Sequence, residues 1–323
     1  MSATGDVVPA VVVGSPDDEH ARRVAGLLSP QTCTLVDVVS LAQRSYRLDR
    51  DGLWLDQQAD HDGGIRRWAA RVGRGSRGWL RRFAPPDWHR GVLLDSKDAA
   101  VKTAWLTLLT AFVRSSGVEW LTDLDALNRA ENKLAQYRAA LTLGIPTPAT
   151  VVASDRASLP TDLAHRIVVK PLGPGHFTRG SGDRRVLYAN VATLDEPLLD
   201  DLPGAPFIVQ DRIEARTHLR VVTVRSSVWA CAVDAGEVPF DWRRHAAAQR
   251  SFRPARPPVE VEDGAGRISE HLRLGYTSQD WVIDHAGTAW FLDLNPSGQW
   301  LFLPEPVASA VAERLAAWLT GRS

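Results

Sequence analysis

The sequence predicts a mixed α/β (α+β) protein built from two or three packed subdomains. A continuous apolar strand over residues 7–14 is followed at once by a helix over 17–28, an order typical of α/β domains. Towards the C-terminus, apolar and alternating residues predict an antiparallel hairpin followed by a closing helix. At 323 residues the chain is long enough for several hydrophobic cores.

Composition narrows the classes of function. Acidic and basic residues balance at a formal net charge of zero, so the molecule has no global attraction to membranes or nucleic acid, and we expect no nucleic-acid partner. No apolar run is long enough to cross a bilayer, and the first residues lack a signal-peptide pattern, which predicts a cytoplasmic protein. Cys33 and Cys231 lie in apolar runs and are expected to be buried thiols.

Residues 1–125 are expected to form an N-terminal α/β domain. Its expected elements are the strand over 7–14, helix 17–28, strand 34–39, hairpin 46–55, helix 97–114 and strand 118–121. Either Ser15 or Asp17 can cap the first helix, and Asp51-Gly52 supplies the hairpin turn. The apolar residues of the last helix are expected in the core: Val101, Trp105, Leu108 and Phe112.

Residues 65–90 differ in composition from the rest of this domain. The segment holds eight arginines and one acid, Asp87, interleaved with Trp68, Trp79 and Trp88. Charge runs usually form a solvated face, which is one interpretation. The other is a surface for an acidic partner, anchored by the tryptophans.

Residues 126–205 are expected to form a small central domain. A helix capped by Asp123 or Asp125 leads into it and ends near Gly144. One face of that helix carries Leu127, Leu134, Tyr137 and Leu141. The other expected elements are strand 150–153, helix 155–163, buried strand 166–172, Gly-rich loop 173–184 and strand 186–188.

Residues 206–323 are expected to form a C-terminal domain rich in antiparallel strands. The expected elements are strands 207–210, 219–224 and 228–233, a hairpin of 281–283 with 289–294, and helix 307–319. Asp280, Asp293 and Asn295 would converge at one end of this hairpin, because residues two apart on a strand share a face. Such oxygen ligands suit Mg²⁺. The alternative is a capped hairpin without metal.

The order of several features resembles the ATP-grasp superfamily from about Ala126 onward. These features are Lys133, Lys170, the Gly-rich loop, Gln210, Arg220 and the set Asp280, Asp293 and Asn295. Three stretches look like those of graspetide (microviridin-type) peptide maturases: residues 130–134 (Ala-Glu-Asn-Lys-Leu), 241–243 (Asp-Trp-Arg) and 295–300 (Asn-Pro-Ser-Gly-Gln-Trp). The resemblance implies a pre-ATP-grasp N-terminal domain, followed by central and C-terminal domains that clamp ATP between two antiparallel sheets.

The resemblance implies ATP and Mg²⁺ as cofactors. Lys133 and Lys170 would contact the α- and β-phosphates, whose negative charge needs cations, metal and backbone donors. A strand holds Lys170 in place, because this lysine directly follows the buried residues 167–169. The alternative for either lysine is an ordinary surface position.

The hinge that binds the adenine edge is implied at Gln210, Asp211 and Ile213, mainly through backbone atoms. Relatives usually hold the ribose with an acid two residues before the γ-phosphate arginine, and this chain has His218 there. Glu214 is a possible substitute for that acid.

Three residues resemble the catalytic set of the family. Arg220 would face the γ-phosphate, where developing charge needs a fixed cation. Asp241 and Arg243 would hold the acidic side chain of the substrate, with Asp241 orienting Arg243 or accepting a proton. The alternatives are a strand arginine in an ion pair and a salt-bridged loop pair.

The function implied is ATP-dependent cross-linking of a ribosomal precursor peptide, with a leader and an acidic core as the partner. A Glu or Asp side chain would become an acyl phosphate, and a Ser, Thr or Lys side chain would attack it to give an ω-ester or ω-amide. Two alternatives stay open: an ATP-grasp ligase for a free amino acid, and a relative that binds nucleotide or peptide without catalysis. Relatives of this kind are often dimers, so a homodimer is expected.

Overall fold

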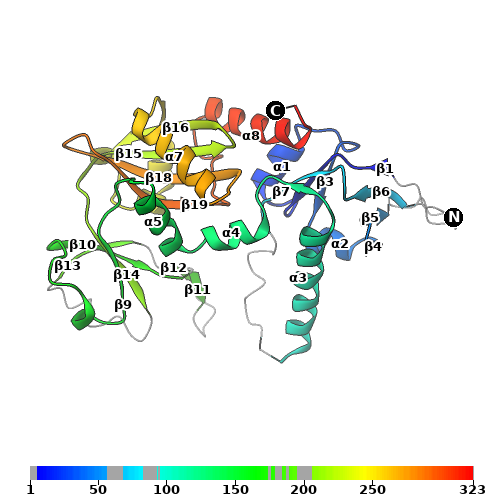
Figure 1. The fold of residues 1–323 in the computed structure, drawn as a ribbon, viewed down its shortest axis with the longest axis horizontal. Coiled ribbons are helices and arrows are strands. Elements are labelled where there is room, and N and C mark those ends of the chain that lie inside the picture. The colour runs from blue at the N-terminus through cyan, green and yellow to red at the C-terminus, as the bar shows by residue number, and fades with distance from the viewer. Residues whose placement is uncertain are drawn as a thin grey trace.

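The computed structural model describes residues 6–56, 68–82, 93, 95–173, 176–178, 184–186, 189–194 and 206–322. Two small sheets lie in the N-terminal part, a four-stranded antiparallel sheet in the middle, and a five-stranded antiparallel sheet in the C-terminal part (Figure 1). The predicted mixed α/β class is therefore confirmed. Within these ranges, no helix has the length and apolar character that a bilayer crossing requires.

A parallel sheet in the order β3-β2-β7-β8 forms the centre of the N-terminal part. Its strands are β2 (Ala10–Val13), β3 (Cys33–Val36), β7 (Arg77–Leu80) and β8 (Glu119–Trp120). The second sheet contains β1 (Asp6–Val7), β4 (Tyr46–Asp49), β5 (Gly52–Asp56) and β6 (Trp68–Val72). The helices are α1 (Glu19–Ala25), α2 (Val38–Ala42) and α3 (Lys97–Ser115). The predicted hairpin over 46–55 is confirmed, because β4 and β5 pair antiparallel.

The predicted strand over residues 7–14 is wrong as one element. It divides at Pro9 into β1 and β2, which join different sheets, since proline lacks the N–H that a ladder requires. The predicted cap of α1 is also wrong: Asp18 Oδ1 accepts from the backbone N–H groups of His20 and Ala21. The strand expected over 34–39 ends at Val36, because Asp37 caps α2.

The Arg-rich segment 65–90 is only partly described. Trp79, a proposed surface anchor, is 2% exposed and packs against Tyr276 and Trp300, so neither a solvated face nor a binding surface fits it. The strand β7 places it there, inside the core of the parallel sheet. Trp88 and the side chain of Trp68 lie outside the description.

The helices after β7 depart from two expectations about burial. Val101 of α3 is 46% exposed, and the core face of this helix is Leu109, Phe112 and Val113. The single helix predicted before Gly144 is two, α4 (Leu124–Ala130) and α5 (Lys133–Thr142), capped by Asp123 and Asn132. Leu141 is 67% exposed, because the break at residues 131–132 shifts the helical face.

The central sheet has the order β13-β10-β14-β9, and all of its neighbouring strands are antiparallel. Its strands are β9 (Thr150–Ala153), β10 (Arg166–Pro171), β13 (Asn190–Thr193) and β14 (Phe207–Asp211). The predicted helix over 155–163 is only a 3-10 turn, Arg156–Ser158. Of the strand predicted over 186–188, residues 187 and 188 lie outside the described residues; Val186 ends β12 (Arg184–Val186), which pairs with β11 (His176–Thr178).

The C-terminal sheet has the order β17-β16-β15-β18-β19. Its strands are β15 (Ala215–Val224), β16 (Ser227–Asp234), β17 (Arg253–Ala255), β18 (Tyr276–Asp284) and β19 (Ala289–Asn295). The helices of this part are α6 (Ala246–Arg250), α7 (Val259–His271) and α8 (Glu305–Leu319). An apolar core shared with the N-terminal part contains Val12, Trp79, Trp300 and Leu315. Both cysteines are buried free thiols, as predicted.

Candidate active site

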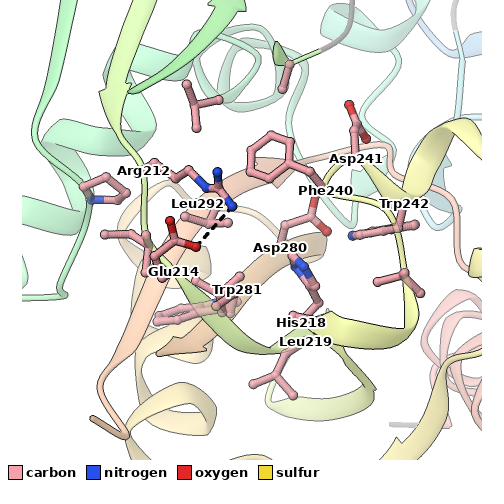
Figure 2. Close-up of a pocket in the computed structure, with 18 of the residues that line it drawn as sticks. Arg212, Glu214, His218, Leu219, Phe240, Asp241, Trp242, Asp280, Trp281 and Leu292 are labelled. Atoms are coloured by element: carbon pink, nitrogen blue, oxygen red, sulfur yellow. Dashed lines mark hydrogen bonds and ion pairs between the residues drawn. The ribbon is translucent and has the colours of Figure 1, made fainter. Parts of the chain in front are cut away.

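Two adjoining cavities lie between the central and C-terminal sheets. The first, of about 720 Å³, reaches from the end of β14 to the β18–β19 hairpin, and part of its lining is drawn in Figure 2. The second, of about 500 Å³, continues towards the loop after β19. The two cavities share lining residues, among them Lys170, Asp241, Arg243, Asp280 and Asp293. These five residues mark the place where the cavities meet.

The predicted hairpin at residues 281–294 is confirmed and brings two acids together. Asp280 of β18 and Asp293 of β19 are direct cross-strand partners. The turn is closed by Asp284, whose Oδ1 accepts from the N–H of Thr288, and by Gly287, whose φ of 90° favours glycine. A bulge after Asp280 shifts the register so that Trp281 pairs with Phe291.

Lys133 reaches this hairpin from the first turn of α5. Its Nζ lies 2.6 Å from both carboxylate oxygens of Asp293. Helix α5 is held over β19 by Gln136, which donates to the carbonyl of Leu294 and accepts from its N–H. Burial raises the pKa of Asp293, but Lys133 and Lys170 outweigh it and hold that pKa below its ordinary value. Asp293 is therefore an anion between two lysines.

Lys170 stands on β10 facing the same place. Desolvation lowers the pKa of its ammonium to about 8, against the opposing attraction of Asp293. Among the described residues, no carboxylate lies within ion-pair distance of Lys170. Such a lysine is suited to an anionic ligand that restores the lost solvation.

Arg220 is buried beneath the acids on β15. It is 7% exposed, and it pairs across the strands with Asp280, whose Oδ1 lies 2.7 Å from Nη1. Its Nη2 donates to the carbonyl of Gln299, and its buried Nε has no partner within the described part of the chain. The ion pair that was the alternative interpretation of Arg220 is thus present, and Arg220 also lines the second cavity.

Asp241 and Arg243 form a bidentate pair at the meeting point of the cavities. Arg243 Nε lies 2.8 Å and Nη2 lies 3.2 Å from the two carboxylate oxygens of Asp241. Asp241 is buried, whereas the Arg243 side chain is 43% exposed. Nη1 of Arg243 remains 3.6 Å from Asp280. Asp241 therefore fixes the direction of an arginine whose remaining donors face the cavities.

The predicted adenine hinge lies on the wall of the first cavity. Gln210 is buried and donates to the Oγ1 of Thr150, so its side chain is structural. Asp211 is engaged on both sides, because its N–H donates to the carbonyl of Ala149 and its carboxylate accepts from the N–H of Ala164. Within the described residues, the backbone N–H and C=O of Ile213 have no hydrogen-bond partner. Ile213 thus places an unpaired backbone edge on the wall of the first cavity.

Glu214 and His218 differ in their availability for a ribose. Glu214 accepts hydrogen bonds from Arg166 and Arg212, and Figure 2 shows its pair with Arg212. His218 lies close to Asp280 in the same view. Desolvation lowers the pKa of His218, so a neutral imidazole lines this wall. Within the described part of the chain the His218 imidazole has no hydrogen bond or ion pair, whereas the Glu214 carboxylate has two, and both side chains line the first cavity.

The acids fit a hard divalent cation. Asp280, Asp293 and Asn295 all line the second cavity and offer only oxygen ligands. The described residues contain no group of three or more His, Cys, Asp and Glu placed for a metal, so a cation would need Asn295 and other ligands. Asn295 Oδ1 accepts from the N–H of Ser297. Mg²⁺, which retains waters and phosphate oxygens, fits two acids and an amide.

A cluster of charged residues at the edge of the N-terminal sheet was not predicted from the sequence. Asp18, Arg81 and Arg82 form ion pairs there, and Arg81 donates to the carbonyl of Ser297. His20 Nε2 accepts the backbone N–H groups of Trp300 and Leu301. Two adjacent arginines directly after the apolar pair Trp79-Leu80 were the available signal.

This cluster corrects the expectation for Trp300. The resemblance of residues 295–300 to the maturases implies that residues 298–300 shape the wall near the acceptor. Trp300 is instead 0% exposed and packs against His20, Trp79 and Tyr276. Gly298 fits the expectation better, because a Cβ there would lie 2.5 Å from Ser278 and 3.1 Å from Arg220 Nη2.

No protein-family model matches the sequence, and no curated protein does either. Solved structures are similar. One is a RiPP-associated ATP-grasp ligase from Chryseobacterium gregarium in complex with ADP and a leader and core peptide, at 18% identity and a TM-score of 0.78; the similarity covers 98% of this chain and 97% of that one. Another is the macrocyclase MdnC from Microcystis aeruginosa bound with precursor peptide MdnA, at 18% identity, a TM-score of 0.73 and coverage of 98% and 100%.

A third is the ATP-grasp ligase PsnB complexed with a phosphomimetic variant of its minimal precursor, Mg and ADP, at 18% identity and a TM-score of 0.70. That similarity covers 97% of this chain and 99% of that one. At such identity the likeness concerns the fold, and it extends over nearly the whole length of each chain. The chain therefore has the ATP-grasp fold that the sequence resemblance predicted.

Proposed function

We propose that this protein is an ATP- and Mg²⁺-dependent ligase that cross-links side chains of a ribosomal precursor peptide. The observation that carries the proposal is the meeting of the two cavities at Lys170, Arg243, Asp280 and Asp293. The first cavity has the free backbone edge for an adenine, and the second is lined by cations. The γ-phosphate of ATP bound in the first cavity could thus meet an acidic side chain of a peptide bound in the second.

The chemistry follows from that meeting. A carboxylate oxygen of a substrate Glu or Asp attacks the γ-phosphorus of ATP, and the bond from that phosphorus to the β,γ-bridging oxygen breaks, releasing ADP. The hydroxyl of Ser or Thr, or the amine of Lys, then attacks the acyl carbon, and phosphate leaves. The attacking group loses one proton. Each ω-ester or ω-amide thus costs the peptide one water.

The residues divide this work by position. Lys133 and Lys170 would hold the α- and β-phosphates, and Arg220 would face the γ-phosphate. Mg²⁺ at Asp280, Asp293 and Asn295 would neutralise phosphate charge and align the oxygens. Arg243, fixed by Asp241, would receive the substrate carboxylate. The backbone near Gln210, Asp211 and Ile213 would bind the adenine, and His218 or Glu214 the ribose.

A peptide substrate is supported over a free amino acid by the second cavity. Its lining includes Arg82, Arg220 and Arg243, which suit an acidic chain, and it extends past the metal residues to Gln249 and Gln299. The similar structures from C. gregarium and M. aeruginosa carry a leader and core peptide and a precursor peptide, respectively. A free amino acid would leave the part of the cavity lined by Arg82, Gln249 and Gln299 unused.

The test is peptide-dependent ADP formation. Purified protein receives Mg·ATP and synthetic peptides encoded by short reading frames beside its gene, and mass spectrometry follows the loss of one water per cross-link. Arg243→Lys keeps the charge and loses the bidentate fork, so ADP formation should fall by roughly a hundredfold. Ligation of free amino acids with no response to any peptide would contradict the proposal.

Two further properties belong to the proposal. A cytoplasmic location is proposed, because a ribosomal peptide substrate is made there. A homodimer is proposed from the resemblance to the maturases. Light scattering coupled to size exclusion would measure the mass directly, and a monomer at micromolar concentration would contradict this part alone.

A further inference from the structure

The paired arginines Arg81 and Arg82 follow strand β7 at the carboxyl edge of the parallel N-terminal sheet. Their backbone N–H groups both donate to the carbonyl of Val13, at 2.9 and 3.0 Å, at the end of β2. Crevices at the carboxyl ends of parallel strands are where open α/β sheets bind ligands. This edge borders the second cavity, which Arg82 and Ser297 both line.

Both side chains reach the carboxylate of Asp18, but they differ in exposure. Arg81 is 0% exposed and ties the edge together, because its Nε lies 3.1 Å from Asp18 and it donates to the carbonyl of Ser297. The side chain of Arg82 is 40% exposed and faces the cavity. Arg81 is therefore structural, and Arg82 is available to a ligand.

Charges in the second cavity leave Arg82 in excess. The three acids of the lining each have a close cation: Asp293 has Lys133, Asp280 has Arg220 and Asp241 has Arg243. Asp18 is shared, since it lies 3.1 Å from Arg81 and 3.5 Å from Arg82, and its neighbour His20 is neutral because burial lowers its pKa to about 3. Among the described lining residues, Lys170 has no acid within ion-pair distance, and Arg82 shares its only acid, Asp18, with the closer Arg81.

We propose that Arg82 binds a second carboxylate of the peptide substrate, next to the one that is phosphorylated. The proposal rests on the proposed function and names an anchoring residue for it. Arg82 lines the second cavity and is absent from the lining of the first, so it faces the peptide end and not the adenine end. A planar guanidinium is suited to a bidentate carboxylate. Peptides with several acids are thus selected over peptides with one.

The experiment uses the full chain and fluorescein-labelled synthetic peptides in the presence of Mg·ADP. One peptide alternates Thr and Glu; the matched peptide has Gln at all Glu positions but one. Fluorescence anisotropy should show about tenfold tighter binding of the acidic peptide by the wild type. Arg82→Ala should remove this preference, Arg82→Lys should keep part of it, and neither should change the affinity for Mg·ADP.

Arg50→Ala is the matched control, because the Arg50 side chain is 91% exposed in the N-terminal hairpin and lines neither cavity. It should bind both peptides as the wild type does. An acidic-peptide preference that survives Arg82→Ala, or is absent from the wild type, overturns the proposal. A loss of Mg·ADP affinity in Arg82→Ala also overturns it, by assigning Arg82 to phosphate. The anisotropy experiment measures peptide binding and needs no catalytic turnover. A failure of the proposed ligase function would appear in a different measurement, as the absence of peptide-dependent ADP formation.

Discussion

Lys133 and Asp293, 160 residues apart in the chain, form a bidentate ion pair with 2.6 Å from Nζ to each carboxylate oxygen. The pair joins a lysine that is proposed to bind phosphate with an acid that is proposed to bind metal. A cation that binds Asp293 must share this carboxylate with Lys133, and a bound phosphate would give Lys133 a new anion. Metal and nucleotide are therefore expected to bind together.

The first prediction concerns Asp293. Asp293→Asn removes the anion while keeping the size of the side chain, so ADP formation should fall by at least about a hundredfold at saturating Mg²⁺. Asp263→Asn is the control, because Asp263 is exposed on α7 and pairs only with Arg267 among the described residues. Steady-state ADP release over a Mg²⁺ titration measures both. An Asp293→Asn enzyme with unchanged Mg²⁺ dependence would refute the metal assignment.

The second prediction is a pH dependence of nucleotide binding set by Lys170. Desolvation lowers its pKa to about 8, and phosphate binds the protonated ammonium, so affinity for Mg·ADP should fall as pH rises through 8 and approach tenfold per pH unit above it. Lys170→Arg stays charged and should flatten this profile. Calorimetric titrations between pH 6.5 and about 9.5 would show it, and identical profiles for the two proteins would exclude Lys170 as the titrating group.

The stability of the ligand-free protein should respond to Lys170 with the opposite sign. The folded-state pKa lies below the ordinary value of 10.5, so between these pH values the unfolded chain binds more protons. The contribution of Lys170 to stability is therefore present above 10.5 and is lost as pH falls through about 8.

The third prediction concerns Gly298, which lies against Arg220. A Cβ there would lie 2.5 Å from the Cβ of Ser278, so Gly298→Ala should displace the loop and Arg220, lowering kcat by roughly tenfold or more. Gly266→Ala is the control, because a Cβ at this position of α7 meets nothing within 4 Å. It should keep full activity and stabilise the fold by up to about 1 kcal/mol. Equal activities would show that the approach at Gly298 has no catalytic role.

The fourth prediction concerns His20, which is 7% exposed and accepts two backbone N–H groups from the loop after β19. Burial and the nearby Arg81 lower its pKa to about 3. The stability it contributes is complete above the ordinary value of 6.5 and is lost progressively as pH falls towards 3, on the order of a few kcal/mol in total.

His20→Gln cannot titrate, and its amide oxygen can still accept a hydrogen bond. The difference in unfolding free energy between wild type and His20→Gln should therefore change between pH 6.5 and 4, and stay constant from pH 7 to about 9. Urea unfolding at each pH measures this difference. If the difference in unfolding free energy stayed constant over the whole pH range, protonation of His20 would not destabilise the fold, and the prediction would be wrong.

The sequence alone determined several of the local elements and the order of the site residues. Periodicity and turn residues predicted the hairpin with Asp51-Gly52 and the hairpin with Asp280 and Asp293, because both depend on neighbours close in the chain. The same patterns failed where a single residue ended an element. Pro9 divides the predicted first strand, and Asn132 begins α5 as a separate helix. The ordered set of lysines, arginines and acids sufficed to indicate the ATP-grasp fold.

Only the tertiary structure decided which charges meet. Lys133 reaches Asp293 because α5 packs on β19, and Arg81 reaches Ser297 across 216 residues because two cores merge around Trp79 and Trp300. No periodicity encodes such distances, since each depends on how separate elements bury their apolar faces against one another. The structure also decides which of the two adjacent arginines is exposed: Arg81 is buried and Arg82 is not. The sequence pattern does not distinguish them.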